Sequence, residues 1–282
     1  PCDRLAEQRD GEWIAEQLDI AGEERFLAKA GVFVDEITGV GADQCFYKGI
    51  MEALGYSENK TAFREMARRV PLADLLPVLK EACSDDDCAV MIQARLFGVA
   101  GLLTTRHSGC QPKMSAKDWH FYHNRPLNSP VRRIVAMSHL LVRYRKRGII
   151  YVADRLWDTP LKELPGALEE MLMVSSGSDD GLRGAALLGR ERAAIIVVNA
   201  VLPFMSARGR KNSLPEIASK AWEVYHRYPR LSANAIERHM AHQLGVSKDI
   251  VSGACRQQGL LHLYKAFCTQ GKCGACPLGK RR

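Results

Sequence analysis

Helical periodicity is the feature that most constrains the fold of this chain. Apolar residues recur at spacings of three and four along residues 26–37, 46–54 and 63–70. This spacing places apolar side chains on one face of an α-helix, where they can pack against neighbouring elements. Glycine or proline follows each of these stretches, as is typical where a helix ends. We therefore expect helices along most of the sequence.

Evidence for strands is limited to one short segment. Residues 148–152 (Gly-Ile-Ile-Tyr-Val) form a β-branched apolar run, but one such run cannot make a sheet by itself. We predict an all-α fold, a multi-helix globular array of roughly ten to twelve helices that ends in a cysteine-rich, metal-binding tail.

Several helix starts are marked by capping residues. Ser57 is placed to cap the helix that carries residues 63–70, and three aspartates at 85–87 suit the start of the helix at 88–103, since acids complement the helix dipole there. Ser213 and Glu216 have the spacing of a capping box.

A polar stretch at 175–181, rich in serine and glycine, is the best candidate for a linker. It separates a helical body at 1–174, with an acidic N-terminal part, from a C-terminal helical region at 182–282. The longest apolar run, at 193–204, has twelve residues and includes an asparagine, whereas a membrane span needs about 20. We expect a buried helix there and no membrane partner.

Charge is distributed unevenly along the chain. The net charge is +8, but residues 1–90 carry −9 and residues 91–282 carry +17. A strongly basic region favours a polyanion such as DNA or RNA as a partner. The alternative is a basic lobe that packs against the acidic one. The acidic N-terminal part is also a candidate docking face for a protein partner.

The C-terminal tail carries three closely spaced thiols, Cys268, Cys273 and Cys276. The Cys-x2-Cys half has the spacing that grips a tetrahedral metal. Cys255 is the first candidate for a fourth ligand and His262 the second. We predict a structural zinc ion or iron–sulfur cluster at this site; the alternative is a tail of reduced thiols without metal. The nine cysteines are otherwise scattered, which favours a reducing cytoplasm.

The Cys-Pro-Leu ending also resembles the terminal iron–sulfur loop of DNA glycosylases of the endonuclease III class. The resemblance covers only this loop. It departs from that class in having four residues rather than six between Cys268 and Cys273, and in lacking a final cysteine. The spacing therefore favours a structural clip over a repair cluster.

Residues 237–254 match the template of a helix-turn-helix, with a small residue at Ala241 and a turn glycine at Gly245. The recognition helix would begin at Ser247 and present Lys248 and Arg256 to a major groove. The alternative is a pair of ordinary packed helices joined at a glycine, because such matches are common in helical proteins.

A further polar constellation lies around two prolines four residues apart. Arg125 and Arg133 flank this rigid turn, which Asn128 can hold through its side chain. Paired arginines suit a phosphate or carboxylate ligand, although they can equally tie helices together. Arg143 and Arg145 belong to a basic cluster at the end of the following helix, which is either a solvated helix end or a polyanion surface.

Several of these segments together resemble a bacterial family, the domain of unknown function 2851. The resemblance extends in order over most of the chain from about residue 25. The matching stretches are Ala53–Asn59 with Phe63, Pro71–Leu72, Ala94–Leu103, Trp119–Arg133, Asn199–Phe204 and Gln258–Tyr264, followed by the three tail cysteines.

The resemblance implies that members usually carry a further N-terminal region that looks like a restriction-type nuclease core. Because the sequence begins at Pro1, we expect it to start after that region. We expect a nucleic-acid-binding accessory module of a longer nuclease-like protein. The alternatives are a phosphate-ligand enzyme that uses Arg125, Asn128 and Arg133, and a protein-interaction scaffold. No catalytic constellation is recognisable in the sequence.

Overall fold

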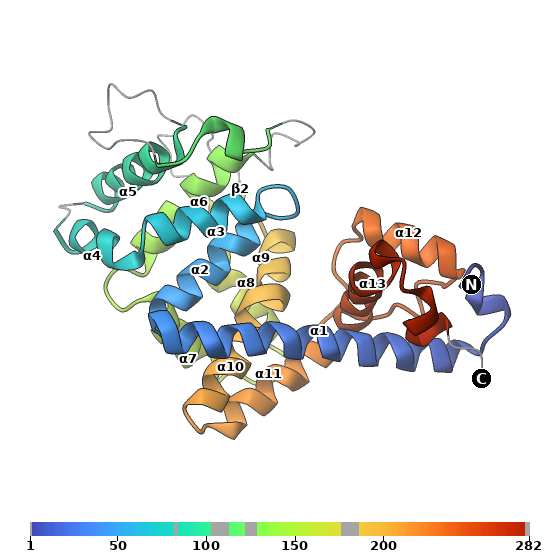
Figure 1. The fold of residues 1–282 in the computed structure, drawn as a ribbon. Coiled ribbons are helices and arrows are strands. Elements are labelled where there is room, and N and C mark those ends of the chain that lie inside the picture. Colours follow the sequence, from blue (N-terminus) through green and yellow to red (C-terminus); the bar gives the residue numbers. More distant parts are fainter. Residues whose placement is uncertain (1, 82–83, 103–112, 122–128, 176–185, 280–282) are drawn as a thin grey trace. The chain divides into compact units, whose positions relative to one another are not determined.

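The structure, a computed structural model, describes residues 2–81, 84–102, 113–121, 129–175 and 186–279. Most of these residues are helical, which confirms the all-α prediction. The helices in chain order are α1 (Gly11–Val40), α2 (Ala42–Leu54), α3 (Lys60–Arg69), α4 (Leu72–Glu81), α5 (Asp85–Ala100), α6 (Pro130–Arg143), α7 (Ile149–Leu156), α8 (Leu164–Leu172), α9 (Arg190–Ile196), α10 (Leu202–Lys211), α11 (Pro215–Arg227), α12 (Ala235–Leu244) and α13 (Ala254–Ala266) (Figure 1).

The other regular segments are short. β1 (Val174–Ser175) and β2 (Ala186–Leu188) pair antiparallel. A π-helical segment at Val197–Val201 joins α9 to α10. Single 3-10 turns lie at Leu5–Glu7, Ala116–Asp118, Cys268–Gln270, Cys273–Ala275 and Pro277–Gly279.

Of the helix starts predicted from capping residues, one is confirmed by the structure and two are not. Ser84 caps α5 by accepting a hydrogen bond from the backbone N–H of Asp87, and the three aspartates form the first turn as expected. Ser57 is not a cap, because α3 begins after Asn59. Ser213 is not a cap either: it adopts a positive φ of 56°, and the residue before α11 is Leu214. A serine in that conformation lies outside the extended region that an N-cap adopts.

The chain forms two compact units by its contacts, and they differ from the domains expected from the sequence. The first unit comprises Pro1–Val34 and Leu202–Arg282, and the second comprises Asp35–Val201. Residues 186–201 belong with the second unit because β2 pairs with β1 and α9 packs on α8. Residues 1–34 belong with the first because their apolar side chains fill its core. Proximity in space, rather than the polar stretch at 175–181, decides the division.

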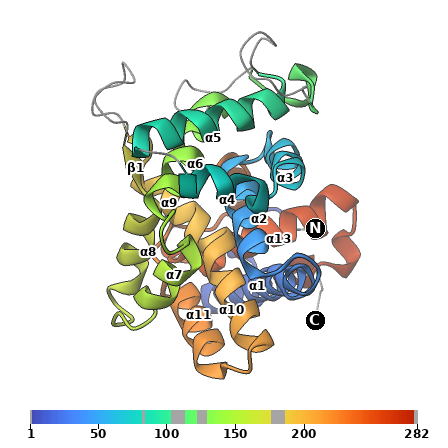
Figure 2. The same cartoon turned by 90° about the vertical axis from the view of Figure 1, so that its left-hand side faces the viewer.

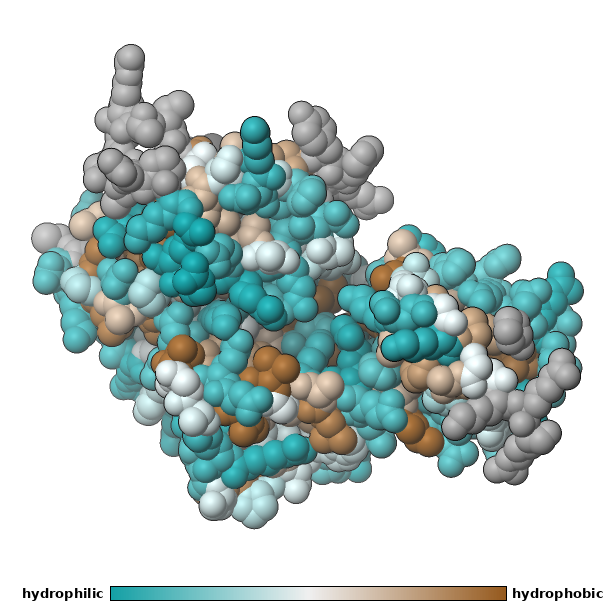
Figure 3. All heavy atoms as spheres, viewed as in Figure 1, coloured by the Kyte–Doolittle hydropathy of each residue, from teal (hydrophilic) through white to brown (hydrophobic). Residues whose placement is uncertain are grey.

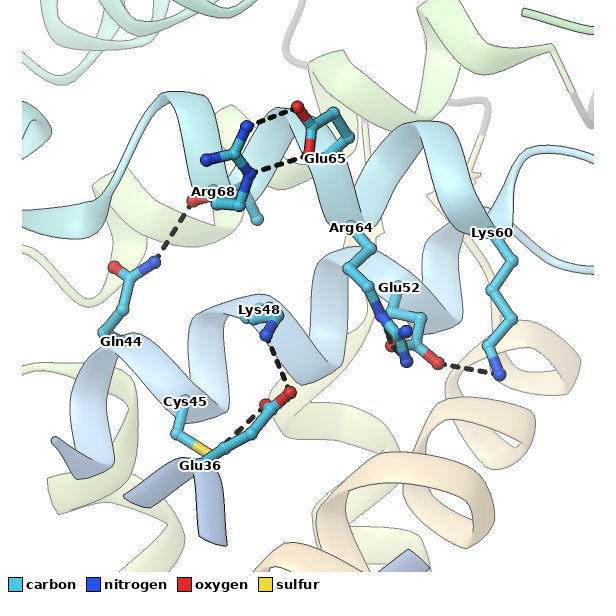
Figure 4. A network of polar contacts seen from close by, with 10 residues as sticks. Glu36, Gln44, Cys45, Lys48, Glu52, Lys60, Arg64, Glu65 and Arg68 are labelled. Carbon is cyan, nitrogen blue, oxygen red and sulfur yellow. Dashed lines mark hydrogen bonds and ion pairs between the residues drawn. The ribbon is translucent and has the colours of Figure 1, made fainter. Parts of the chain in front are cut away.

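In the second unit, α2 and α3 are held together by an ion-pair network (Figure 4). The carboxylate of Glu52 accepts contacts from Lys60 at 2.7 Å and Arg64 at 2.5 Å. Gln44 at the start of α2 uses both ends of its amide: it donates to the carbonyl of Ala67 at 3.1 Å and accepts from the N–H of Leu72 at 2.7 Å. These contacts fix where α3 ends and α4 begins.

A second layer of this unit is formed by α5 and α6, which lie beside each other (Figure 2). Trp119 fastens the segment after α5, because its indole N–H donates to the carbonyl of Ala100 at 3.0 Å and its ring meets Phe63 edge-on at 5.2 Å. The strand-like run at 148–152 forms the start of α7, with Ile150 buried. Burial of one apolar face in a helix suits that run as well as a strand would.

Residues Arg190–Lys211 form a continuous helical stretch of 22 residues that is apolar enough to cross a membrane by length and composition. Its most apolar window is 78% buried inside the structure. Burial of this kind is what a core helix shows, and it agrees with the buried helix expected at 193–204.

The first unit has its own hydrophobic core. Ile14 and Leu18 of α1 pack with Met240 and Leu244 of α12 and with Leu260 of α13, all nearly inaccessible to solvent. Two glycines let α1 and α13 approach closely. A Cβ added at Gly22 would lie 2.2 Å from the carbonyl oxygen of Cys255, and one at Gly259 would lie 2.1 Å from that of Leu18.

Exposed apolar side chains are dispersed over the surface. Ile20, Leu27 and Val32 on α1, and Val90 and Met91 on α5, are each at least 40% exposed. In Figure 3 most of the visible face is hydrophilic and the hydrophobic side chains appear in separate small groups. Such scattered exposure is ordinary for a globular surface.

Candidate metal centre

Four thiols surround one small cavity in the first unit. Cys2, Cys268, Cys273 and Cys276 line a space of about 10 Å³ together with Phe267 and Gly279. A volume of that size accommodates about one water-sized sphere. Three of these cysteines are the tail thiols singled out in the sequence; Cys2 lies more than 260 positions earlier in the chain.

Cys2 reaches the cavity because the N-terminal segment is anchored to α12. Leu5 is buried in the core of the unit, and the N–H of Arg4 donates to the carbonyl of Gln243 at 2.8 Å. The side-chain amide of Gln243 donates to the sulfur of Cys2 at 3.3 Å. In Figure 1 the N-terminal segment lies beside the C-terminal 3-10 turns. Cys2 is 8% exposed.

The tail folds back on itself through three consecutive 3-10 turns. The N–H of Lys272 donates to the carbonyl of Phe267 at 2.9 Å, and the N–H of Cys276 donates to the carbonyl of Cys273 at 3.2 Å. Gly279 completes the fold at a point where only glycine fits, because an added Cβ would lie 2.4 Å from the carbonyl oxygen of Cys273. These turns bring three sulfurs separated by four and two residues to the same side of the tail.

The thiols influence one another electrostatically. Burial raises the pKa of Cys268, and the neighbouring thiols of Cys2, Cys276 and Cys273 raise it further. Burial likewise raises the pKa of Cys276, against which the backbone N–H groups of Leu278 and Gly279 act by hydrogen bonding to its sulfur. Gathering several thiolates is unfavourable unless a cation compensates their charge.

The sulfurs do not stand at ligand distances from a common point. Within the described part of the chain, no group of three or more His, Cys, Asp or Glu side chains has the arrangement of a formed metal site. Lining one cavity requires only proximity, whereas coordination by thiolate requires sulfurs about 2.3 Å from the same ion. The donor set suits a soft or borderline metal, because it is made of thiols alone.

Cys255, the fourth ligand expected from the sequence, lies elsewhere. It is 2% exposed on the face of α13 that packs against α1, and its thiol donates to the carbonyl of Asp19 at 3.6 Å. Burial, followed by the charges of Asp19 and Glu23, raises its pKa to about 12. His262 instead pairs with Glu24 at 3.3 Å. Both side chains point to α1, so neither lines the thiol cavity.

The predicted recognition helix does not begin at Ser247. α12 ends at Leu244 before Gly245, and α13 begins only at Ala254. Lys248 is exposed in the connection between them. Arg256 is engaged, because its guanidinium contacts both carboxylate oxygens of Asp19 at 3.0 and 3.1 Å. The connection of nine residues exceeds the three or four of a helix-turn-helix motif, which favours the reading of ordinary packed helices.

Arginines expected to bind phosphate make contacts within the second unit. Arg133 is 4% exposed and donates to the carbonyl of Leu54. Burial and the charge of Arg192 lower its pKa to about 10. Arg143 donates to the carbonyl of Met173 at 2.6 Å, and Arg145 pairs with Asp85 at 2.9 Å. Arg125 and Asn128 lie outside the described residues.

Acidic and basic segments of the sequence pair with each other inside the first unit. Residues 202–282 hold 14 Lys and Arg against 4 Asp and Glu, whereas residues 1–34 hold 4 against 8. Acids of α1 contact basic partners from the C-terminal segment: Asp19 pairs with Arg256, and Glu23 with His226 at 2.8 Å. This is the packing of acidic on basic segments that the sequence offered as an alternative, and it still leaves a net charge of +6 on the unit.

A larger cavity of about 460 Å³ lies in the same unit, between α10 and α11. Its lining includes Arg210, Ser213, Ser219 and Trp222. Arg210 is exposed and Trp222 is partly exposed. Arginine and an aromatic ring that line the same groove are a combination found where proteins bind single-stranded nucleic acids.

Comparison with known proteins identifies a family without a described activity. No curated protein and no solved structure matches the chain. A family model described as "Protein of unknown function (DUF2851)" matches residues 1–164, which is more than half of the sequence. The segments at 199–204 and 258–276 that also resemble this family lie beyond the matched residues. The chain therefore belongs to the DUF2851 family of proteins of unknown function.

Proposed function

We propose that the protein is a helical module stabilised by a structural metal, zinc or an iron–sulfur cluster, bound by Cys268, Cys273 and Cys276. The observation that supports this is the common cavity that the three tail thiols line. The sequence spacing alone is compatible with thiols that never meet, but the three 3-10 turns bring them together.

The role of the metal is structural rather than catalytic. The tail contributes Cys276 and Leu278 to the hydrophobic core of the first unit, so a metal that closes the tail also holds this part of the core. A cavity of about 10 Å³ has no room for a substrate beside the ion. Catalytic metal sites keep a position open for one.

Metal content and visible absorption of anaerobically purified protein test this proposal. We expect bound zinc, or iron with the visible absorption of a cluster. Cys273→Ser should lose the metal and lower the thermal midpoint. Cys88→Ala, a buried cysteine of the second unit, should keep the metal. Wild-type protein that contains neither element, with a Cys273→Ser variant as stable as wild type, would refute the proposal.

A second proposed function is binding of single-stranded nucleic acid in the groove between α10 and α11. Arg210 and Trp222 line this groove, in a unit with a net charge of +6. Base stacking on an aromatic ring contributes about 1–3 kcal/mol per base. The proposal extends the nucleic-acid expectation to residues other than the predicted helix-turn-helix.

Titration with a fluorescent oligonucleotide at two salt concentrations tests the groove. We expect binding that weakens as salt rises, with quenching of tryptophan fluorescence that is absent in Trp222→Phe. Arg210→Gln should reduce the slope of log K against log salt by about 0.7. Arg227→Gln is the matched control, since Arg227 pairs with Glu223 at 2.8 Å on the same helix as Trp222. Absence of binding at low salt removes this function.

A further inference from the structure

Cys2 is held at the thiol cavity by contacts that need no metal. The hydrogen bond from Arg4 to Gln243 and the burial of Leu5 fix the backbone next to it, and the Gln243 side chain donates to its sulfur. Outer contacts of this kind orient the ligands of metal sites. The position of Cys2 is therefore determined by the fold of the unit.

Cys2 completes the donor set that the tail leaves one short. Structural sites of this metal class take four ligands in tetrahedral arrangement. The tail supplies three, and Cys2 is the remaining thiol that lines the same cavity. Cys255 has no place in this set because its thiol is directed to the carbonyl of Asp19.

The small size of the cavity favours a single metal ion over a cluster. A space of about 10 Å³ corresponds to about one water-sized sphere. An iron–sulfur cluster brings several iron atoms and sulfides between its four thiolates, and needs more room. A single ion is therefore favoured over a cluster, and the four sulfurs must close to ligand distance around it when it binds.

We infer that Cys2 is the fourth ligand of a single-ion centre with Cys268, Cys273 and Cys276, and that the ion is zinc. The inference rests on the proposed metal-binding function and adds to it the missing ligand and the nuclearity. It also makes the metal a link between the first residues of the chain and its C-terminal tail.

Competition for Zn²⁺ with a chromophoric chelator, using the full chain, measures the contribution of Cys2. Cys2→Ser should weaken zinc affinity by at least about 100-fold, more than loss of an outer-shell contact would. Gln243→Leu should weaken it about 10–100-fold, since it removes the donor to Cys2 but no ligand. Cys255→Ser is the matched control and should bind zinc like wild type.

Substitution with Co²⁺ provides a second readout that does not depend on stability. The intensity of the sulfur-to-cobalt charge-transfer band rises with the number of thiolates bound, and tetrahedral Co²⁺ has characteristic visible bands. We expect four thiolates in wild type and in Cys255→Ser, and three in Cys2→Ser.

The outcomes separate the two proposals. Wild type that binds no Zn²⁺ or Co²⁺ removes both. If wild type binds metal but Cys2→Ser keeps its affinity and four thiolates, the inference is wrong and the tail site stands. Iron with cluster absorption in wild type overturns the single-ion assignment. A disulfide from Cys2 to a tail cysteine, found by mass spectrometry of protein purified without oxygen, overturns Cys2 as a ligand.

Discussion

Asn59 shows how one polar side chain organises the second unit. It is 1% exposed, and its amide makes two hydrogen bonds with the backbone of His120: it donates to the carbonyl at 2.9 Å and accepts from the N–H at 2.7 Å. The pair joins the start of α3 to the segment that carries Trp119. Both hydrogen bonds connect residues 61 positions apart in the sequence, so this amide holds two distant segments together.

Replacement of Asn59 by alanine should destabilise the protein by about 1–3 kcal/mol, because two hydrogen bonds made by this buried amide are lost. The midpoint of urea denaturation measures the change. Ser57→Ala is the control: Ser57 is exposed and caps no helix, so its removal should change stability by less than about 0.5 kcal/mol. Equal effects of the two substitutions would contradict this role of Asn59.

His262 gives the first unit a pH dependence. Burial lowers its pKa from 6.5 and outweighs the carboxylate of Glu24, which acts in the opposite direction. As pH falls below about 6.5, the unfolded chain takes up this proton before the folded chain does, so stability decreases. His262→Gln should lose less stability than wild type between pH 7.5 and pH 5.5 in urea titrations. A steeper loss in the variant would show that the sign is wrong.

Among single residues, the sequence predicted a helix cap that depends on neighbouring residues. It did not predict a side-chain position that depends on residues far away in the chain. The cap at Ser84 follows from aspartates next to it in the chain. The cavity that Cys2 shares with the tail thiols could not be predicted, since nothing in the sequence around Cys2 distinguishes it from the other cysteines. Cys255 is the nearest thiol in sequence to the tail, but the packing of α13 turns its side chain toward Asp19 of α1.

Among the helices, α1 and α13 show how a crossing is determined by small residues. Gly22 lies against the backbone of Cys255, and Gly259 against that of Leu18. Without side chains at these two positions, the helix backbones come into contact and the acids of α1 meet their partners on α11 and α13. Helical periodicity can predict that a segment is helical. The spacing of apolar residues does not show at which residues two helices will cross.

Gly22→Ala should therefore destabilise the protein by about 1–3 kcal/mol through overpacking, with α1 forced away from α13. Gly31→Ala on the same helix is the control of opposite sign. Gly31 is exposed and an added Cβ would meet nothing within 4 Å, so alanine should stabilise by up to about 1 kcal/mol. Thermal denaturation of the two variants compares them directly. Stabilisation by both would mean that the crossing is not tight.

The residue composition of α7 suggests a strand, but the segment is helical because of its tertiary packing. The β-branched run at 148–152 has the residues of a strand, yet it follows Gly148 directly as a helix that buries Ile150 and Ala153. These two residues are three apart, which is a helical spacing. Packing of α7 against α8 overrides the strand preference, since β-propensity depends strongly on context.

Over the whole molecule, stability should be divided between the two units. Leu260 and Leu96 are each completely buried, the first in the unit of α12 and α13 and the second in the unit of α5 and α6. Either residue changed to alanine should cost about 2–5 kcal/mol. Hydrogen exchange followed by mass spectrometry should show faster exchange in 235–266 for Leu260→Ala, and in 85–100 for Leu96→Ala. Uniformly faster exchange along the chain in both variants would indicate one cooperative unit.

The domain boundary was the part of the architecture least accessible from the sequence. The polar stretch at 175–181 looks like a linker by composition, but β1 and β2 on either side of it pair with each other. A polar composition indicates that a segment is suited to contact with solvent. The division into units depends instead on which distant segments share a hydrophobic core. Leu5, Ile14 and Leu18 share theirs with residues near the other end of the sequence.

The joining of early and late residues in the first unit has a consequence during biosynthesis. Leu5 and Leu18 are synthesised before their core partners Leu260 and Leu278, which follow after roughly 12 to 55 s at about 5–20 residues per second. Residues 35–201, by contrast, contain all the partners of their unit. The emerging chain can therefore complete the second unit while Leu5, Ile14 and Leu18 still lack their core partners and keep their apolar side chains exposed.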